Sequence, residues 1–335
     1  HLYLAMACEK IQDEKTVLAH LAHAFHLASN LESQHPLVVA GREARKLLEV
    51  VQSDPMIGPQ ASGLLKQVIQ FEHDVPTLRR RLRRRASTVP FAPPRLSIQA
   101  LGKAQVRVDE RLVTNADWQA QKRVRDLLFF LLAHPEGVTK EAVGAIFWPD
   151  SSPAQLKLRF KNVIYRLRHA LGQDIVVFDE DCYQFNRQSD YEYDVEVFLG
   201  KLAQAQAATD PREQAAVYQV AIHLYKGPYL PKMEETWVWL ERERLRQAYL
   251  EAVLKLAGLH LEMGEYRMAL DYCRQALADD LCLEEAHRLA MRAYAAMGNR
   301  AAIARQFERC RHALWSEANA SPSPQTEALF ETLMR

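Results

Sequence analysis

Hydrophobic positions along residues 154–171 recur with the period of an α-helix that buries one side. At about 100° per residue, the apolar side chains fall on a single stripe. These are Leu156, Phe160, Val163, Ile164, Leu167 and Leu171. The opposite side is polar or cationic, and the segment contains no acidic residue. Exposed helix faces usually mix both signs of charge, because Glu–Lys pairs one turn apart add stability. The acid-free face is therefore a candidate for binding a polyanion.

Eight side chains on or beside this face are candidate DNA contacts. Lysine and arginine attract the phosphate backbone, whereas asparagine, arginine and histidine can form hydrogen bonds with base edges in the major groove. The candidates are Lys157, Arg159, Lys161, Asn162, Tyr165, Arg166, Arg168 and His169. Taken alone, the segment fits a basic surface helix without a partner about equally well.

The segments around this helix follow the order of a winged helix-turn-helix domain, which we place at residues 95–190. Residues 95–115 alternate and turn as three short strands, and apolar spacing predicts helices over 119–133 and 140–147. Residues 175–185 then predict a hairpin, the wing. In this order of elements the third helix enters the major groove while the others brace it. The surroundings therefore favour DNA binding by the basic helix.

Two local details bear on this domain. Thr139 precedes the second helix, where its hydroxyl can accept a hydrogen bond from the helix N-terminus. The wing tip contains Asp179, Glu180 and Asp181, whereas a minor-groove contact would favour arginine or lysine. We therefore do not expect the wing tip to read DNA.

Both ends of the chain are predicted to be helical repeats. Residues 1–78 divide into four helical segments separated by turns, as in a superhelical repeat array. In residues 191–335, a Met-Gly turn at Gly264 recurs at Gly298 with the 34-residue period of tetratricopeptide (TPR) repeats. The predicted fold class is mainly α, with TPR-like helical repeats flanking a winged helix-turn-helix domain that has short β-strands.

Residues 191–335 also carry predictions about individual positions. Leu256, Ala269 and Ala276 fall at core positions of the repeat pattern. The stacked helices are expected to bury Trp237 and Trp239. Ser323-Pro324 is a favourable N-cap and first-turn pair for a closing helix.

Residues 79–94 are predicted to be a basic, proline-rich linker. They begin with the run RRRLRRR and continue into a stretch rich in proline and alanine that cannot extend a helix. The arginine run could contact DNA phosphates beside the winged helix, or it could be a solvated boundary between domains. The sequence leaves both possibilities open.

Composition favours a soluble multidomain protein. The chain has 335 residues, of which 48% are hydrophobic and 25% charged, enough for two or three globular domains. The formal net charge of +1 hides an acidic last domain beside basic earlier ones, so any DNA-binding charge is local. Five scattered cysteines favour a reducing compartment, and neither a secretory leader nor a long apolar run is present. We expect a cytoplasmic location, no membrane partner and, because the chain opens on His1, a piece of a longer protein.

The sequence offers no support for catalysis or a cofactor. It contains no glycine-rich phosphate loop, nucleophile elbow, HExxH helix or paired-carboxylate motif. His20, His23 and His26 suggest a metal site, but three residues at this spacing spread too far around a helix to converge. We therefore expect no enzyme activity, no cofactor and no metal.

A series of motifs in residues 95–335 resembles the SARP family, the Streptomyces antibiotic regulatory protein type of activator. The motifs are WPD, VIYRLRHALG, YQF, YDVEVF, LYKGPYL and W-x-W-L-E-R-E-R-L. Within them, Arg168 and Gly172 match the end of the family's recognition helix, and Asp194 and Phe198 match the opening of its activator domain. The first domain resembles the end of the repeat array in large MalT-like regulators.

The resemblance implies a response-regulator-type winged helix joined to a bacterial transcriptional activator domain. It further implies binding to double-stranded DNA, self-association on repeated half-sites, and contact with RNA polymerase. The sequence thus predicts a sequence-specific transcriptional regulator that acts as an activator. The alternative is a TPR scaffold whose winged helix mediates contacts with other proteins, although a basic third helix favours DNA.

Overall fold

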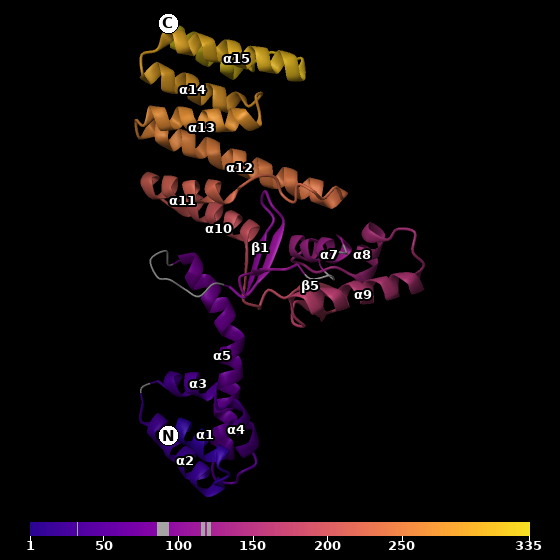
Figure 1. Ribbon diagram of the computed structural model, residues 1–335. Coiled ribbons are helices and arrows are strands. Elements are labelled where there is room, and N and C mark those ends of the chain that lie inside the picture. The colour runs from indigo at the N-terminus through magenta and orange to yellow at the C-terminus, as the bar shows by residue number, and fades with distance from the viewer. Residues whose placement is uncertain (32, 86–93, 115–117, 119–121) are drawn as a thin grey trace. The chain divides into compact units, whose positions relative to one another are not determined.

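The computed structural model describes residues 1–31, 33–85, 94–114, 118 and 122–335 (Figure 1). It divides into two compact units, one of residues 1–94 and 134–191, and the other of residues 95–133 and 192–335. Helices dominate both units, and the strands form one four-stranded and one two-stranded sheet. The predicted fold class, mainly α with TPR-like repeats and a winged helix, is confirmed.

The first helices pack around a shared apolar core (Figure 1). They are α1 (Leu2–Lys10), α2 (Glu14–Ser29), α3 (His35–Gly41), α4 (Arg45–Val51) and α5 (Gly58–Arg85). Apolar spacing predicts one helix over residues 37–53, the third of the four predicted segments, but the structure has α3 and α4 there instead. The two are separate because α3 ends at Gly41, a poor helix former, where the backbone comes so close to α5 that an added Cβ would lie 2.9 Å from the Val68 side chain.

Helix α5 continues through Pro76 and the arginine run, which the sequence had placed in a linker. A proline inside a helix removes one backbone hydrogen bond and costs about 3 kcal/mol. Contacts beyond Pro76 offset that cost. The Thr77 hydroxyl donates to the Gln188 side chain at 3.2 Å, and Arg83 forms an ion pair with Asp190 at 2.5 Å. These contacts between distant segments explain why the helix does not end where local sequence predicts.

The second and third helices of the winged domain have the predicted bounds to within one residue: α8 (Lys140–Phe147) and α9 (Pro153–Leu171). The Thr139 hydroxyl accepts a hydrogen bond from the Ala142 amide at 3.2 Å, confirming the predicted cap. Ser152 and Gln155 form a reciprocal capping box at the start of α9. Local side chains thus determine where α9 begins, and with it the position of the basic face.

The wing is the hairpin of β4 (Val176–Asp179) and β5 (Cys182–Phe185). Glu180 and Asp181 at its tip have φ of 46° and 61°, the left-handed conformation that a two-residue turn needs. The backbone of Val138 pairs with Tyr183 by two hydrogen bonds of 3.0 and 2.8 Å. This pairing anchors β5 to the segment that precedes α8.

In the second unit, the four-stranded sheet has the order β3-β2-β1-β6. Its strands are β1 (Leu96–Gln99), β2 (Gln105–Val108), β3 (Arg111–Leu112) and β6 (Tyr191–Tyr193). The register pairs Leu96 with Val108 and Ile98 with Val106, and three of these four side chains are buried. The first helix of the winged domain, α7 (Lys122–Ala133), belongs to the same unit, while residues 119–121 of the predicted helix lie outside the described residues.

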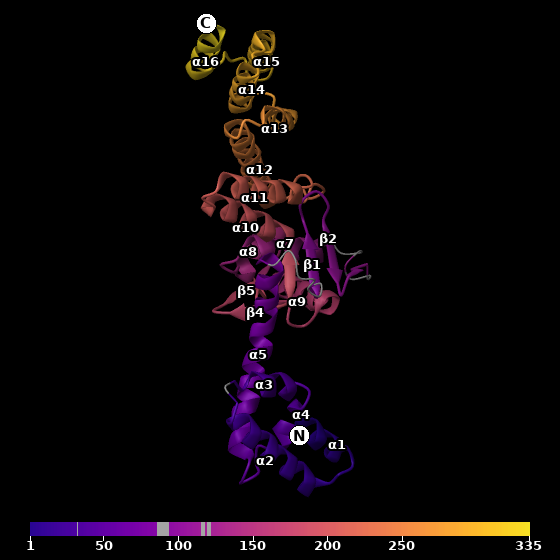
Figure 2. The same cartoon turned by 90° about the vertical axis from the view of Figure 1, so that its left-hand side faces the viewer.

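Successive antiparallel helices then stack along residues 194–334, which lie in the predicted activator domain and are called the activator segment below (Figures 1 and 2). They are α10 (Asp194–Ala207), α11 (Pro211–Leu224), α12 (Thr236–Glu262), α13 (Tyr266–Asp279), α14 (Glu284–Ala296), α15 (Arg300–Ala318) and α16 (Pro324–Met334). Gly264 and Gly298 end α12 and α14 with φ of 78° and 69°, which confirms the repeated turn. The three predicted core residues, Leu256, Ala269 and Ala276, are fully buried.

The prediction for the tryptophans of α12 is wrong at one position. Trp239 is 61% exposed. Trp237 instead packs edge-to-face on Phe130 of α7, with ring centroids 5.2 Å apart. Residues i and i+2 of a helix face different ways, so only one of the two tryptophans can turn inward.

None of the described helices is both long and apolar enough to span a membrane.

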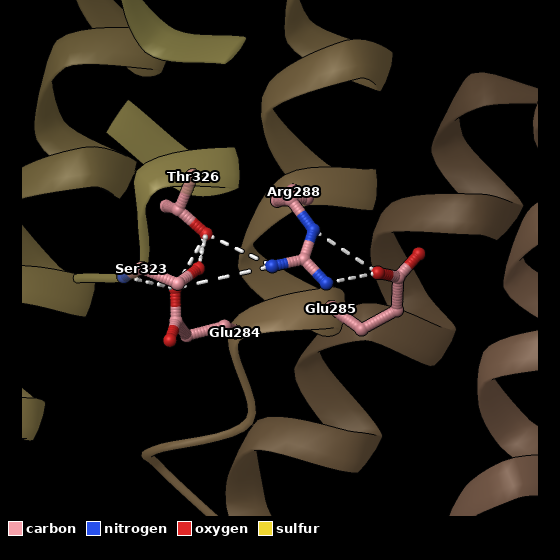
Figure 3. A network of polar contacts seen from close by, with 5 residues as sticks. All are labelled: Glu284, Glu285, Arg288, Ser323 and Thr326. Atoms are coloured by element: carbon pink, nitrogen blue, oxygen red, sulfur yellow. Dashed lines mark hydrogen bonds and ion pairs between the residues drawn. The ribbon is translucent and has the colours of Figure 1, made fainter. Parts of the chain in front are cut away.

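A partly buried polar network holds the closing helix α16 against α14 (Figure 3). Glu284 accepts hydrogen bonds from the Ser323 hydroxyl at 2.7 Å and the Thr326 hydroxyl at 2.5 Å, and Arg288 donates to Thr326 at 2.9 Å. Burial opposes ionisation of Glu284, but these hydrogen bonds and Arg288 keep its pKa below the ordinary value. Ser323 occupies the predicted N-cap position, yet its hydroxyl serves Glu284 and makes no side-chain cap bond.

Candidate nucleic-acid interface

The acid-free face of α9 is exposed along its length. Lys157, Lys161, Asn162, Tyr165 and His169 all have exposed side chains, while the apolar stripe opposite them is buried except for the half-buried Leu156. The rings of Tyr165 and His169 lie nearly parallel, with centroids 6.2 Å apart. Helical periodicity thus brings these predicted residues onto one surface, which offers cations for phosphates and hydrogen-bonding groups for base edges.

The three arginines of α9 differ in their surroundings. Arg159 is exposed and donates to the Ser151 hydroxyl at 3.0 Å, which holds the guanidinium beside the start of the helix. Arg166 is half-buried. Arg168 differs from the expectation for a DNA contact, because its guanidinium donates to the Val176 carbonyl at 2.9 Å. Arg168 therefore joins the end of α9 to the first strand of the wing.

The structure adds one residue that the search for polar groups missed. Leu158 is 62% exposed and lies one turn before Asn162 on the same side of α9. A large apolar side chain at such a position can contact the methyl group of thymine in a major groove. In the sequence, the sign of an exposed Leu158 is its position outside the apolar stripe of the helix.

The wing tip carries negative charge at its exposed end. Asp179, Glu180 and Asp181 are all exposed, and Val177 and Phe178 beside them are 41% and 53% exposed. Carboxylates at this position would repel a phosphate backbone. The cationic surface of α9 thus attracts a polyanion, whereas the acidic wing tip repels it.

The arginine run of α5 has two kinds of position. Arg79 and Arg81 are exposed. Arg80 lies over the Tyr191 ring at 4.5 Å, and Arg83, with its side chain 9% exposed, pairs with Asp190. Two arginines of the run therefore bind the segment that follows the wing, a role that neither sequence interpretation contained.

The sheet is fastened to the activator segment by residues of the YDVEVF and LYKGPYL motifs. The partly buried Asp194 carboxylate accepts hydrogen bonds from the backbone amides of Ala100 and Leu101, each at 2.9 Å. The hydroxyls of Tyr193 and Tyr229 lie 3.3 Å apart, and both rings are buried. Burial outweighs the backbone hydrogen bonds and raises the pKa of Asp194 to about 6.

The loop that carries Tyr229 is itself held by one arginine. Arg242 of α12 donates to the carbonyls of Tyr229, Leu230 and Met233 at 2.7–2.8 Å. The loop also reaches the sheet, because the Leu230 amide donates to the Ala100 carbonyl at 2.9 Å. The motifs that carry the family resemblance thus connect the sheet of the winged domain to the helical array.

The sequence predicts that the histidines of α2 do not form a metal site. His20 and His23 lie beside His1, with ring centroids 5.4 and 4.2 Å from it. Across the part of the chain that the structure describes, no three histidine, cysteine or acidic side chains gather as metal ligands.

Residues 193–334 match the family model of the bacterial transcriptional activator domain. The chain is 25% identical over 255 residues to the regulatory protein AfsR of Streptomyces griseus. That match covers 75% of this chain but 26% of AfsR, so the chain spans about a quarter of this relative.

A solved structure of Mycobacterium tuberculosis EmbR, in complex with a low-affinity phosphopeptide, is similar with a TM-score of 0.63. It shares 18% sequence identity, and the match covers 72% of this chain and 65% of the EmbR chain, which shows a common fold. Together the comparisons confirm the resemblance to SARP-type transcriptional activators. The resemblance of residues 1–78 to a MalT-like array stays a prediction.

Proposed function

We propose that this chain, which carries a bacterial transcriptional activator domain, is a sequence-specific DNA-binding regulator that activates transcription and reads the major groove with α9. The observation that carries the proposal is the exposed, acid-free face of α9, capped at its N-terminus by Ser152. Such a face attracts a polyanion and carries no negative charge that would repel it. The alternative, a scaffold that uses its winged helix for protein contacts, has no comparable support on this face.

Within that proposal the side chains of α9 divide by role. Lys157, Arg159 and Lys161 bind phosphates, which positions the helix without reading sequence. Asn162 and Arg166, with Tyr165 and His169, contact base edges. Arg168 acts indirectly, because its bond to the Val176 carbonyl holds the wing against the end of α9.

Repeated half-sites and RNA polymerase are the further partners we propose. One winged helix buries limited DNA surface, so useful affinity commonly requires two copies on repeated sites. Contact with RNA polymerase is proposed from the resemblance to SARP-type activators. The helical array is proposed to regulate DNA binding, and the hydrogen bonds of Asp194 with the sheet provide a direct connection for it.

The test measures binding of the full chain to a DNA site selected from a random library. Changing Arg166 or Asn162 to alanine should cost about 1–3 kcal/mol on the preferred site and relax specificity. Changing Lys157 or Lys161 to alanine should weaken all sequences alike and reduce the salt slope by about 1 each. Arg305→Ala, which removes an exposed arginine of α15, is the matched control for loss of one positive charge.

A footprint of the Arg166→Ala/Asn162→Ala variant that matches the parent would show that α9 is not the reader. The full chain is the proper material for this test. Deleting residues 191–335 would remove β6 and the Asp194 carboxylate, which hold the end of β1, so the truncated sheet would lose its support.

A further inference from the structure

A cavity of about 380 Å³ lies in the second unit, beside the first helix of the winged domain. Its walls come from residues 102–104 after β1, from α7, and from the loop 230–233 of the activator segment. Apart from Asp126, the buried part of the lining is apolar and partly aromatic: Trp118, Phe129, Leu230 and Met233. Volume and lining are typical of a site for a small organic molecule.

Cations surround the mouth of this cavity. Lys103 and Lys232 are exposed and Arg125 is half-buried, and each lines the cavity. Within the described parts of the chain, none of these three side chains has a hydrogen-bond or ion-pair partner. Lys122, the fourth cation, is bonded to Glu235 at 2.9 Å. Three unpartnered positive charges at the entrance of an apolar cavity favour a negatively charged ligand.

Asp126 is the unusual member of the lining. It is 1% exposed, and its Oδ2 atom, which lies 3.6 Å from the Arg123 guanidinium, has no hydrogen-bond partner in the described part of the molecule. The charged groups around it are Lys122, Arg123 and Arg125 on its own helix, and Glu235 from the segment before α12. Buried polar atoms normally have a partner, so a carboxyl oxygen left without one beside a cavity points to a group that completes it.

We infer that the cavity binds a small organic anion with a flat apolar body. Its acidic group lies among Lys103, Arg125 and Lys232, and the protonated carboxyl of Asp126 donates a hydrogen bond to it. Two neighbouring acidic groups cannot both stay ionised in a buried site without a large cost. Binding therefore takes up one proton from solvent onto Asp126.

The surroundings of Asp126 suit this proton uptake. Burial, followed by repulsion from Glu235, raises the pKa of its carboxyl to about 6, although the three cations of α7 oppose the change. A bound anion raises that pKa further. Since the walls of the cavity belong both to α7 and to the activator segment, an occupant contacts the two segments at once.

Two dyes of similar shape test the charge requirement on the full chain. The anion 8-anilino-1-naphthalenesulfonate should bind at one saturable site, followed by its fluorescence. Combining Lys103→Gln with Lys232→Gln should weaken its binding by about fivefold, which corresponds to the upper end of about 1 kcal/mol for an exposed charge pair. The uncharged N-phenyl-1-naphthylamine should bind both proteins equally. Arg107→Gln, an exposed cation of β2 outside the cavity, should leave both dyes unaffected.

Proton uptake gives the second, independent readout. The sulfonate does not titrate between pH 6 and 8, so a fall in its affinity over this range reports Asp126. We expect a fall of up to tenfold per pH unit, and Asp126→Asn should abolish it. Equal affinity of the mouth variants and the parent, or a pH-independent parent, would overturn the inference. The mouth variants change only exposed side chains, so the test stands even if Asp126→Asn fails to fold.

Discussion

Replacing Asp194 should loosen the junction between the sheet and the helical array. Its two carboxylate oxygens accept from the Ala100 and Leu101 amides in three contacts of 2.9 Å. Alanine would leave both backbone donors without that acceptor. A buried donor without a partner costs about 1–3 kcal/mol, so the gross loss is roughly 2–6 kcal/mol.

Removal of the partly buried Asp194 charge offsets part of this loss. Burial raises the pKa of Asp194 to about 6, so the ionised group is itself unfavourable near neutral pH. We therefore expect Asp194→Ala to destabilise the junction by about 2 kcal/mol. Asp194→Asn should cost less than about 1 kcal/mol, because an amide oxygen at the position of Oδ2 can still accept from both backbone donors.

Hydrogen–deuterium exchange of the full chain is the suitable measurement, because a multidomain chain need not unfold in one step. In peptides that cover residues 96–104, a loss of 2 kcal/mol should accelerate exchange about 30-fold in the alanine variant. Peptides from α13 provide the internal control. Unchanged exchange in the alanine variant, or exchange of the asparagine variant as fast as that of alanine, would refute the reasoning.

Three further predictions concern stability. Folding raises the pKa values of Asp126 and Asp194 to about 6, so the native protein binds more protons than the unfolded chain. Denaturant titrations should therefore show that the free energy of unfolding falls as the pH rises from about 4 to above 6. Asparagine at either site should make this fall smaller. Ala269→Asp places an unpaired charge at a fully buried position, so thermal unfolding should show a loss of several kcal/mol, whereas Ala269→Ser should be far milder. Arg83→Ala breaks a largely buried ion pair and should accelerate hydrogen exchange at the end of α5, while Arg81→Ala, at an exposed neighbour, should not; equal effects would contradict the assigned contact.

Much of the candidate interface was predictable because its determinants are local. The bounds of α8 and α9 follow from caps and apolar spacing within one or two turns, and the basic face follows from helical periodicity. Gly264 and Gly298 likewise mark their turns through a backbone conformation that glycine adopts most readily. Such features depend on neighbours in sequence, so one chain read alone is enough to find them.

Other features depend on segments far apart in the chain. The arginine run was predicted to belong to a linker because a stretch rich in proline and alanine follows it, and only the contacts with residues 188–191 show why α5 extends through it. Arg168 matched a recognition-helix motif, but its side chain binds the Val176 carbonyl instead of facing outward. Periodicity assigns a residue to a face of its helix and does not specify which distant atom lies within its reach.

The sequence by itself determined the order of the elements, the acid-free face of α9 and the resemblance to SARP-type activators. Only the tertiary structure decided that Asp194 and Tyr229 fasten the sheet, that Trp239 is exposed, and that Asp126 lines one cavity together with Lys103 and Lys232. The physical reason is that periodicity and capping act over a few residues, whereas burial and charge pairing depend on packing between segments a hundred residues apart.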